Sequence, residues 1–473
     1  VITTTDDVHD WYDENGEPII QRTERLRFSI SIPSNTEMPE SGWPVVMYGH
    51  GTGGDYRSYI NSGAAATLAR VGIATIGIDQ VHHGPRDDRP NGCDTQGDPS
   101  ACVAALFFNF INPLAGRDNV RQSAADFVSL ARLLRTQTLV VGQGEEMPEP
   151  EPEPEPESET MERDEDQNVP LDAGNDDAGN PSTMEMADGG LSVDSGLGDS
   201  NIIEDLDAGL PEMDAEGMTD ATTQMGDATV DDANDGSIDD SNDGSIDNEL
   251  DADIPEEPAE DIRFRFDPNG LMYLGHSQGG VNGPLFLAVD RNVSGGMLSA
   301  AGGNIAITLE QKKRPFDIAG FAEMLVMLGD NETLDRWHPL FLLVQTFIEP
   351  GDPINYARFW FDEPRDGGVP KSIFMTAGLD DEYTPPDAIF SLAASGAVPI
   401  IPPIRVPIEL NEIRGIEPSG IPPFDGNVAN GDAAAGLLQV PNVGHFVFQN
   451  DITIRNRYKQ FFKSIVDGNP QIF

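Results

Sequence analysis

The sequence is short of basic residues and of long apolar runs, and each shortage excludes a class of protein. Its 473 residues include 28 Lys and Arg against 82 Asp and Glu, a formal net charge of -54. A chain this acidic is repelled by phosphate backbones, and it has no basic stripe with interleaved aromatics, so nucleic-acid binding is not expected. Anionic membrane surfaces are disfavoured for the same reason. No stretch approaches the roughly 20 apolar residues of a membrane-spanning helix, so no transmembrane segment is expected either.

Cysteine is almost absent, and the two that occur, Cys93 and Cys102, lie together in the polar stretch "NGCDTQGDPSAC". An isolated pair that closes a short loop is typical of a disulfide, which forms in an oxidising compartment. Two free thiols or half of a metal site are the alternatives, but no further Cys or His stands at zinc-finger spacing. The sequence begins at Val1 with no apolar signal segment, as expected of a processed mature chain or a trimmed one. We therefore predict a secreted or cell-surface protein without a metal.

The acidic excess is concentrated in residues 143–261. This segment has 41 Asp or Glu against one Arg and contains no Phe, Tyr, Trp or Cys. Such a composition cannot bury enough apolar surface to offset its chain entropy, so a disordered insertion is expected. Its repeated "NDGSID" resembles a calcium loop, but Ala233 occupies a ligand position and no Glu closes the loop. A solvated linker is therefore favoured over weak Ca²⁺ binding.

The flanks of the insertion, residues 1–142 and 262–473, read as one pattern in which strands alternate with helices. Strands are expected at 26–34, 44–51, 73–79, 270–277, 294–302, 371–378 and 435–441. Helices are expected at 58–72, 117–135, 280–290 and 452–466, with a mostly helical block at 304–365. This order predicts an α/β fold, a mostly parallel sheet with helices on both faces. Ligands bind at the carboxyl ends of such strands, so the insertion, which joins a helix to the next strand, should leave from the opposite end.

The stretch "GLMYLGHSQGG" places Ser277 between Gly275 and Gly279, with an apolar strand before it and a helix after it. A serine on a sharp strand-to-helix turn exposes its hydroxyl as a nucleophile, and glycines let the two backbones approach closely. A chance match in a glycine-rich chain is the alternative, which the strand and helix context disfavours. Ser277 is the predicted nucleophile.

A serine nucleophile requires a base and an acid, and both are expected late in the chain. Of seven histidines, His445 in "VPNVGHFVF" follows the last large strand, and it satisfies the order Ser, acid, His. The acid should follow the preceding strand, where "GLDDEYTPP" offers Asp380, Asp381 and Glu382. Asp381 is preferred because it lies three residues after Gly378, at the exposed end of the turn.

Backbone amides are expected to stabilise the oxyanion of the reaction. One donor should be the N–H of Gln278, directly after the nucleophile, and the second that of Gly51 or Thr52 in "GHGTGG". A phosphate-binding loop is the alternative for this glycine-rich stretch, but it lacks the Gly-Lys-Ser/Thr ending that a P-loop requires.

Taken in order, "PVVMYGHGTGG", "DQVHHGPR", "RDNVRQSAADFVSLARLL", "GHSQGG", "GLDDEYTPP" and "GHFVF" resemble the α/β-hydrolase-fold serine hydrolases. Within them the closest resemblance is to bacterial secreted or surface-attached lipases and lysophospholipases. The resemblance covers the chain outside the insertion. It implies Ser277 as nucleophile, Asp381 as acid and His445 as base, with His50 and Gly51 facing the ester carbonyl.

The helical block 304–365 lies where a cap over the site is expected. Its segments "FDIAGFAEMLVML" and "HPLFLLVQTFIEP" are rich in Phe, Leu and Met, as an acyl pocket requires, although the buried faces of packed helices have the same composition. The pocket is accordingly predicted to include His50, Phe321, Leu325 and Phe341.

The sequence thus predicts a carboxylic ester hydrolase, acting on a small-molecule or lipid ester through an acyl-enzyme and without a cofactor. A polyester-degrading or acyl-transfer enzyme is the alternative within this class. From another class, the acidic segment raises the alternative of a calcium-responsive cell-surface or adhesion protein. The sequence does not indicate an oligomeric state.

Overall fold

The computed structural model describes residues 24–34, 36–84, 86, 99–141, 262–326, 328 and 332–473. Two predictions fall outside this part of the chain. Cys93 is not among the described residues, so the Cys93–Cys102 disulfide and the location inferred from it stay predictions. The same holds for the insertion at 143–261, including the calcium-like repeats.

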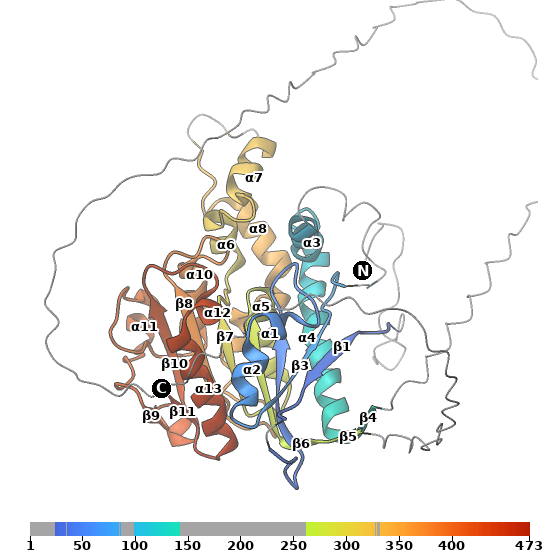
Figure 1. Cartoon of the computed structure of the whole chain (residues 1–473). Helices are drawn as coiled ribbons and strands as arrows, with labels where there is room; N and C mark the ends of the chain where they lie inside the picture. Colours follow the sequence, from blue (N-terminus) through green and yellow to red (C-terminus); the bar gives the residue numbers. More distant parts are fainter. Residues whose placement is uncertain are drawn as a thin grey trace, which may run out of the picture. The chain divides into compact units, whose positions relative to one another are not determined.

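A seven-stranded sheet forms the centre of the described fold, with the order β1-β3-β2-β6-β7-β8-β10 (Figure 1). β1 pairs antiparallel with β3, and all other neighbours are parallel. The strands are β1 (Phe28–Ser31), β2 (Trp43–Gly49), β3 (Ala74–Ile78), β6 (Phe266–His276), β7 (Gly295–Ser299), β8 (Ser372–Gly378) and β10 (Ala435–Val440). Each predicted strand is present, and β2 from before the insertion pairs with β6 from after it.

Helices cover both faces of the sheet, because the central strands are apolar on both sides. Along β2, Val45 and Met47 belong to one apolar cluster with residues of α4 (Pro113–Thr136), α5 (Gln278–Val289) and α10 (Pro386–Ser395). The alternate residues, Val46 and Tyr48, pack against α2 (Ala64–Ala69), α12 (Val447–Asn450) and α13 (Ile452–Val466). This period-two alternation between two apolar layers is what a buried parallel strand requires. The predicted α/β class is therefore confirmed.

The prediction of one continuous helix at 58–72 is wrong, because the chain forms two short helices there. α1 (Ser58–Asn61) ends and α2 begins on either side of Gly63, whose φ is +77°. A residue in this left-handed conformation cannot continue a right-handed helix. The break turns the chain so that α2 lies on the sheet, with Ala64 and Leu68 buried.

The predicted cap block is helical and has a small core of its own. It contains α6 (Ile305–Gln311), α7 (Ile318–Val326), α8 (Pro339–Ile348), the 3₁₀ turn η1 (Glu349–Gly351) and α9 (Ile354–Ala357). Leu309, Leu334 and Phe341 are buried together in the core of this block. The sequence did not indicate α3 (Pro99–Phe108) or α11 (Glu409–Arg414), and α3 lies near this block in Figure 1.

Two small sheets complete the fold. β9 (Phe424–Asp425) pairs with β11 (Gln471–Ile472), and β4 (Leu139–Val141) pairs with β5 (Ile262–Phe264). β5 leads directly into the amino end of β6, while Ser277 follows the carboxyl end of β6. The two points where the insertion joins the fold are therefore neighbours, and they lie at the end of β6 opposite Ser277 (Figure 1). No helix in the described ranges is long and apolar enough to cross a membrane.

Because Val141 is paired with Ile262, the chain on either side of the insertion is held together by β4 and β5. We expect a variant in which a short Gly-Ser linker replaces residues 143–260 to fold as the parent does. Its melting temperature, followed by far-ultraviolet circular dichroism, should change by less than about 4 °C, the shift that 1–2 kcal/mol produces in a domain of this size. A variant without a cooperative transition would show that the segment contributes to the core.

Candidate active site

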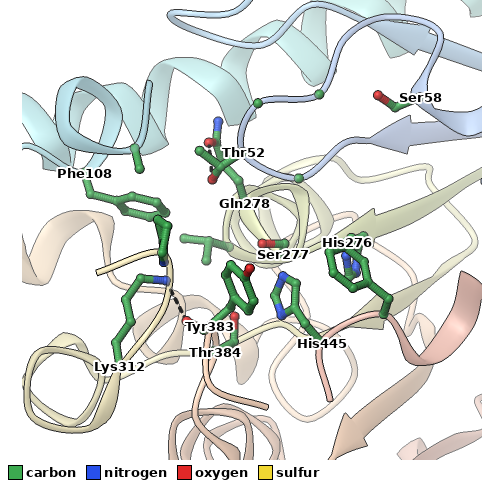
Figure 2. Close-up of a pocket in the computed structure, with 18 of the residues that line it drawn as sticks. Thr52, Ser58, Phe108, His276, Ser277, Gln278, Lys312, Tyr383, Thr384 and His445 are labelled. Atoms are coloured by element: carbon green, nitrogen blue, oxygen red, sulfur yellow. Dashed lines mark hydrogen bonds between the residues drawn. The ribbon is translucent and has the colours of Figure 1, made fainter. Parts of the chain in front are cut away.

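Ser277 stands at the carboxyl end of β6, where the chain turns within one residue into α5 (Figure 2). Its φ of 56° and ψ of -115° are values that residues other than glycine seldom adopt. The turn directs the side chain toward a cavity that Ser277 lines. A strained serine between strand and helix is the geometry that exposes a nucleophilic hydroxyl.

The glycines around Ser277 are required by the contact between backbones. A Cβ on Gly279 would collide with the carbonyl oxygen of Gly49 on β2, and a Cβ on Gly275 would collide with the carbonyl oxygen of Gly279. The buried hydroxyl of Tyr273 donates a hydrogen bond of 2.7 Å to the Gly279 carbonyl. These contacts hold the first turn of α5 against the sheet, and they leave no room for side chains at Gly275 or Gly279.

Asp381 and His445 come from loops after the neighbouring parallel strands β8 and β10, and they meet at the carboxyl edge of the sheet. The Nδ1 atom of His445 lies 3.0 Å from Asp381 Oδ1 and 2.9 Å from Oδ2. Asp381 Oδ1 also accepts hydrogen bonds of 2.8 Å from the amides of Tyr383 and Thr384. The Asp381 side chain is fully buried, whereas the adjacent Asp380 is exposed. Of the carboxylates weighed from the sequence, Asp381 is the one that contacts the imidazole.

Ser277 and His445 line the same cavity, and Figure 2 shows the serine beside the imidazole ring. Because Nδ1 faces the carboxylate, it carries the proton, and Nε2 is left as the basic nitrogen. Among the described residues no hydrogen bond yet joins Ser277 Oγ to Nε2, and such bonds are often long before a substrate binds.

The predicted oxyanion loop lies directly beside Ser277. A Cβ on Gly51 would be 3.2 Å from Ser277 Cβ, so Gly51 is in contact with the serine side chain. The Thr52 hydroxyl donates a 3.0 Å hydrogen bond to Gln278 Oε1. Gln278 begins α5, so its N–H has no acceptor within the helix, and the amides of Gly51 and Thr52 likewise donate no hydrogen bond within the described residues. Three amides close to Ser277 in sequence or in space are thus without an acceptor in the part of the chain that the structure describes.

Three features occur together in one known architecture: the chain order Ser, Asp, His, a serine turn after a central parallel strand, and a glycine-rich loop after the adjacent strand. This chain has an α/β-hydrolase fold. The resemblance stated from the sequence is confirmed at the level of the fold.

The comparisons with known proteins are distant. No family model matches the sequence, and no match to a curated protein sequence was found. Among solved structures, Est1E from Butyrivibrio proteoclasticus with bound ferulic acid is 11% identical, with 94% of each chain covered and a TM-score of 0.36. Acetyl xylan esterase from Paenibacillus sp. R4 is 10% identical over 95% of this chain and 80% of that chain, with a TM-score of 0.40. A monoacylglycerol lipase from Paleococcus ferrophilus is 10% identical over 93% and 99%, with a TM-score of 0.36.

Two histidines and a glutamine hold the oxyanion loop, and the sequence did not indicate this role. His50 donates from Nδ1 to the Gly51 carbonyl at 2.8 Å, and its Nε2 accepts from the Gln80 amide at 3.3 Å. The His50 carbonyl accepts from the amide of Gly279 at 3.0 Å and from Gln80 Nε2 at 2.6 Å. His83 Nε2 accepts from the amide of Gly53 at 3.0 Å. The only signal was that "DQVHHGPR" follows β3, at the same edge of the sheet.

Burial favours the neutral form of three histidines around the site, His50, His83 and His276. Burial lowers the pKa of His50, and burial together with the nearby His50 places the pKa of His83 well below its ordinary value. Burial and the neighbouring His445 do the same for His276, whose ring centroid is 4.8 Å from that of His445. A neutral ring can accept the backbone hydrogen bonds described above. His445 differs from these three histidines in that its ring is paired with a carboxylate.

The cavity over Ser277 has a volume of about 450 Å³, and its apolar wall differs from the predicted one. None of the four predicted pocket residues lines it. His50 is buried under the oxyanion loop, Phe341 is buried in the core of the cap, Phe321 is 48% exposed on α7, and the Leu325 side chain lies outside the described residues. The apolar lining comes instead from α3 and the turn after it (Ala104, Phe108 and Phe110), from α5 (Val281), from α6 and the segment after it (Ile305 and Pro315) and from the loop after β10 (Phe446).

No group of three or more His, Cys, Asp or Glu side chains in the described ranges is arranged to hold a metal ion.

The backbone contact at the serine turn makes a direct prediction. Gly279→Ala should destabilise the protein by about 2–3 kcal/mol, because the new methyl group collides with the main chain of β2 rather than with a movable side chain. Gly420→Ala is the matched control, since only Phe424 Cβ lies near its Cβ position, at 4.0 Å, and it should stay within about 0.5 kcal/mol of the parent. Urea unfolding of both variants measures the difference, and equal stability would contradict the close packing.

Proposed function

We propose that this protein is a serine-dependent carboxylic ester hydrolase. The observation that carries the proposal is the buried pair of His445 and Asp381, 2.9 Å apart, beside a serine held at φ 56°. A strained serine could have a purely structural role, and so could a buried hydrogen-bonded pair of a histidine and an aspartate. Acyl transfer requires a serine, a histidine and free backbone amides at one site, and here Ser277 and His445 line one cavity together with the residues that carry these amides.

The reaction proceeds by general base and nucleophilic catalysis. Ser277 Oγ attacks the ester carbonyl while His445 Nε2 takes its proton, and Asp381 stabilises the imidazolium through the Nδ1–H hydrogen bond. The negative charge on the carbonyl oxygen is met by the N–H of Gln278 and by that of Gly51 or Thr52. His445 then gives its proton to the leaving alkoxide, and an acyl group remains on Ser277. A water molecule then attacks the acyl carbon while His445 takes its proton, and His445 returns that proton to Ser277 Oγ as the bond to the acyl group breaks and the acid leaves.

The cavity favours a small-molecule ester. A volume of about 450 Å³ is within the range of sites that enclose one small ligand, and the aromatic residues from α3 and the turn after it suit an apolar acyl or alkyl group. Polyester cleavage and acyl transfer would use the same catalytic groups, and no feature of the described residues favours either of them.

Ser277→Ala should lower kcat/KM on p-nitrophenyl butyrate by about a thousandfold or more, because no other group can form the acyl-enzyme. The same substitution should abolish covalent labelling of the protein by a fluorophosphonate probe. Ser58→Ala is the matched control for labelling, since Ser58 lines the same cavity but its hydroxyl hydrogen-bonds to Asp55. Retained labelling in Ser277→Ala would place the nucleophile elsewhere.

The two adjacent aspartates allow a test of the acid. Asp381→Asn should lower kcat by about 10³- to 10⁴-fold, because the amide can donate to the imidazole and so favour the wrong tautomer. Asp380→Asn should change kcat by less than about threefold, because Asp380 is exposed and does not touch His445. Equal effects of the two substitutions on kcat, with both variants folded, would contradict the assignment.

A further inference from the structure

A lysine in the wall of the cavity is not used by the proposed mechanism. Lys312 follows the end of α6, and its amine reaches the cavity near Phe108 (Figure 2). Of the residues that line this cavity within the described part of the chain, Lys312 is the sole Lys or Arg, and none is an Asp or Glu. A fixed positive charge therefore faces the space that the ester must occupy.

The next two residues are also basic, and each of them, unlike Lys312, pairs with a carboxylate. Lys313 pairs with Asp317 at 2.8 Å, and Arg314 pairs with Glu382 at 2.7 Å. Lys312 Nζ instead donates to the carbonyl oxygen of Tyr383 at 2.6 Å, and it forms no ion pair with any described carboxylate. An ammonium group has three donors, so two remain for a ligand.

The surroundings of the Lys312 amine are mostly uncharged. The ring of Tyr383 lies 5.9 Å from Nζ, and His445 stacks on Tyr383 with centroids 4.8 Å apart. The carboxylate of Asp381 is the nearby negative charge, and it is already held by His445 and two amides. From α3 and the turn after it come the rings of Phe108 and Phe110, which do not titrate. Burial lowers the pKa of Lys312 to about 8 while Asp381 opposes this, so the amine is mostly protonated at neutral pH.

We infer that the ester substrate carries an anionic group, a carboxylate or a group of like charge, which binds Lys312 while the ester carbonyl lies at Ser277. The inference rests on the proposed esterase function and adds a substrate class to it. A buried ammonium without a carboxylate partner is costly, and a ligand anion in the cavity would both neutralise it and satisfy its free donors. The cavity encloses about 450 Å³ and is lined by both Ser277 and Lys312, so one small molecule can contact both residues.

The competing explanation is structural. Lys312 donates a hydrogen bond to the carbonyl oxygen of Tyr383, and the amide of the same residue donates one to Asp381. Lys312 could therefore act only by positioning this loop. A purely structural lysine would affect all esters equally, because it would act through the catalytic carboxylate. A lysine that binds substrate would affect anionic esters selectively.

The experiment compares matched esters that differ in charge. On the acyl side, mono-p-nitrophenyl adipate is compared with p-nitrophenyl hexanoate; on the alcohol side, p-carboxyphenyl acetate is compared with p-carbamoylphenyl acetate. The quantity measured is the ratio of kcat/KM for the anionic ester to that for its neutral partner. It is measured for the parent, Lys312→Gln, Lys312→Arg and the control Lys313→Gln. Gln retains an N–H donor for the Tyr383 carbonyl, and Arg retains the charge.

For at least one pair of esters, Lys312→Gln should lower this ratio by about tenfold or more, the effect of losing a hydrogen bond to a charged group. Lys312→Arg should restore most of the ratio, and Lys313→Gln should leave it unchanged. In the parent the ratio should also fall as pH rises through about 8, where the amine loses its proton, and in Lys312→Gln it should be flat. Any effect of pH on the chemical step is common to both esters of a pair and cancels in the ratio.

One result would overturn the inference while leaving the esterase intact: a ratio that Lys312→Gln changes for neither pair, whether the two esters of each pair keep their rates or lose them equally. The absence of any Ser277-dependent hydrolysis of all four esters would instead refute the proposed function, and the inference would fall with it. The experiment therefore separates the two failures.

Discussion

The candidate site depends on how closely three backbones approach one another at the end of the sheet. Gly279, in the first turn of α5, lies against Gly49 of β2, and Gly275 of β6 lies against Gly279 in turn. With α5 packed this tightly, the chain has a single residue, Ser277, in which to change from strand to helix. The strained φ of the serine and the free amide of Gln278 both follow from this geometry. The same contact brings the loop after β2, with Gly51, next to the serine side chain.

The parallel sheet supplies the remaining groups at the same edge. Asp381 and His445 are 64 residues apart in sequence, but they follow the adjacent strands β8 and β10, whose last residues are in register. The loop after β3 adds Gln80 and His83, which hold the oxyanion loop through its backbone. Burial keeps these supporting histidines neutral, so they can accept backbone N–H groups without adding positive charge. The direction of the strands, rather than proximity in the sequence, assembles the site.

Local signals in the sequence were sufficient to predict the strands, the serine turn, and Asp381 and His445 as a pair. Each of these is set by a short motif at the end of an apolar strand. The pocket wall was not predictable in this way, because amphipathic helices show that one face is buried but not which partner buries it. Phe341 is buried against the core of the cap and not against the cavity. Phe108 and Phe110 were overlooked because α3 begins at Pro99, within the polar stretch that was interpreted as a cysteine loop. The break at Gly63 was missed because glycine is compatible with several local conformations.

The distribution of charge bears on how an acidic protein can bind an anionic ester. Most of the net charge of -54 comes from residues 143–261, and the strands that flank this segment lie at the amino end of β6, away from Ser277. Charges in water are screened beyond about 8 Å at physiological salt. The ammonium of Lys312 acts from within the cavity wall, where screening is weaker and where no lining carboxylate competes with a ligand. Under the proposed function, net charge would influence how often an anionic ester approaches the protein, whereas Lys312 would hold the ester in the cavity that Ser277 lines.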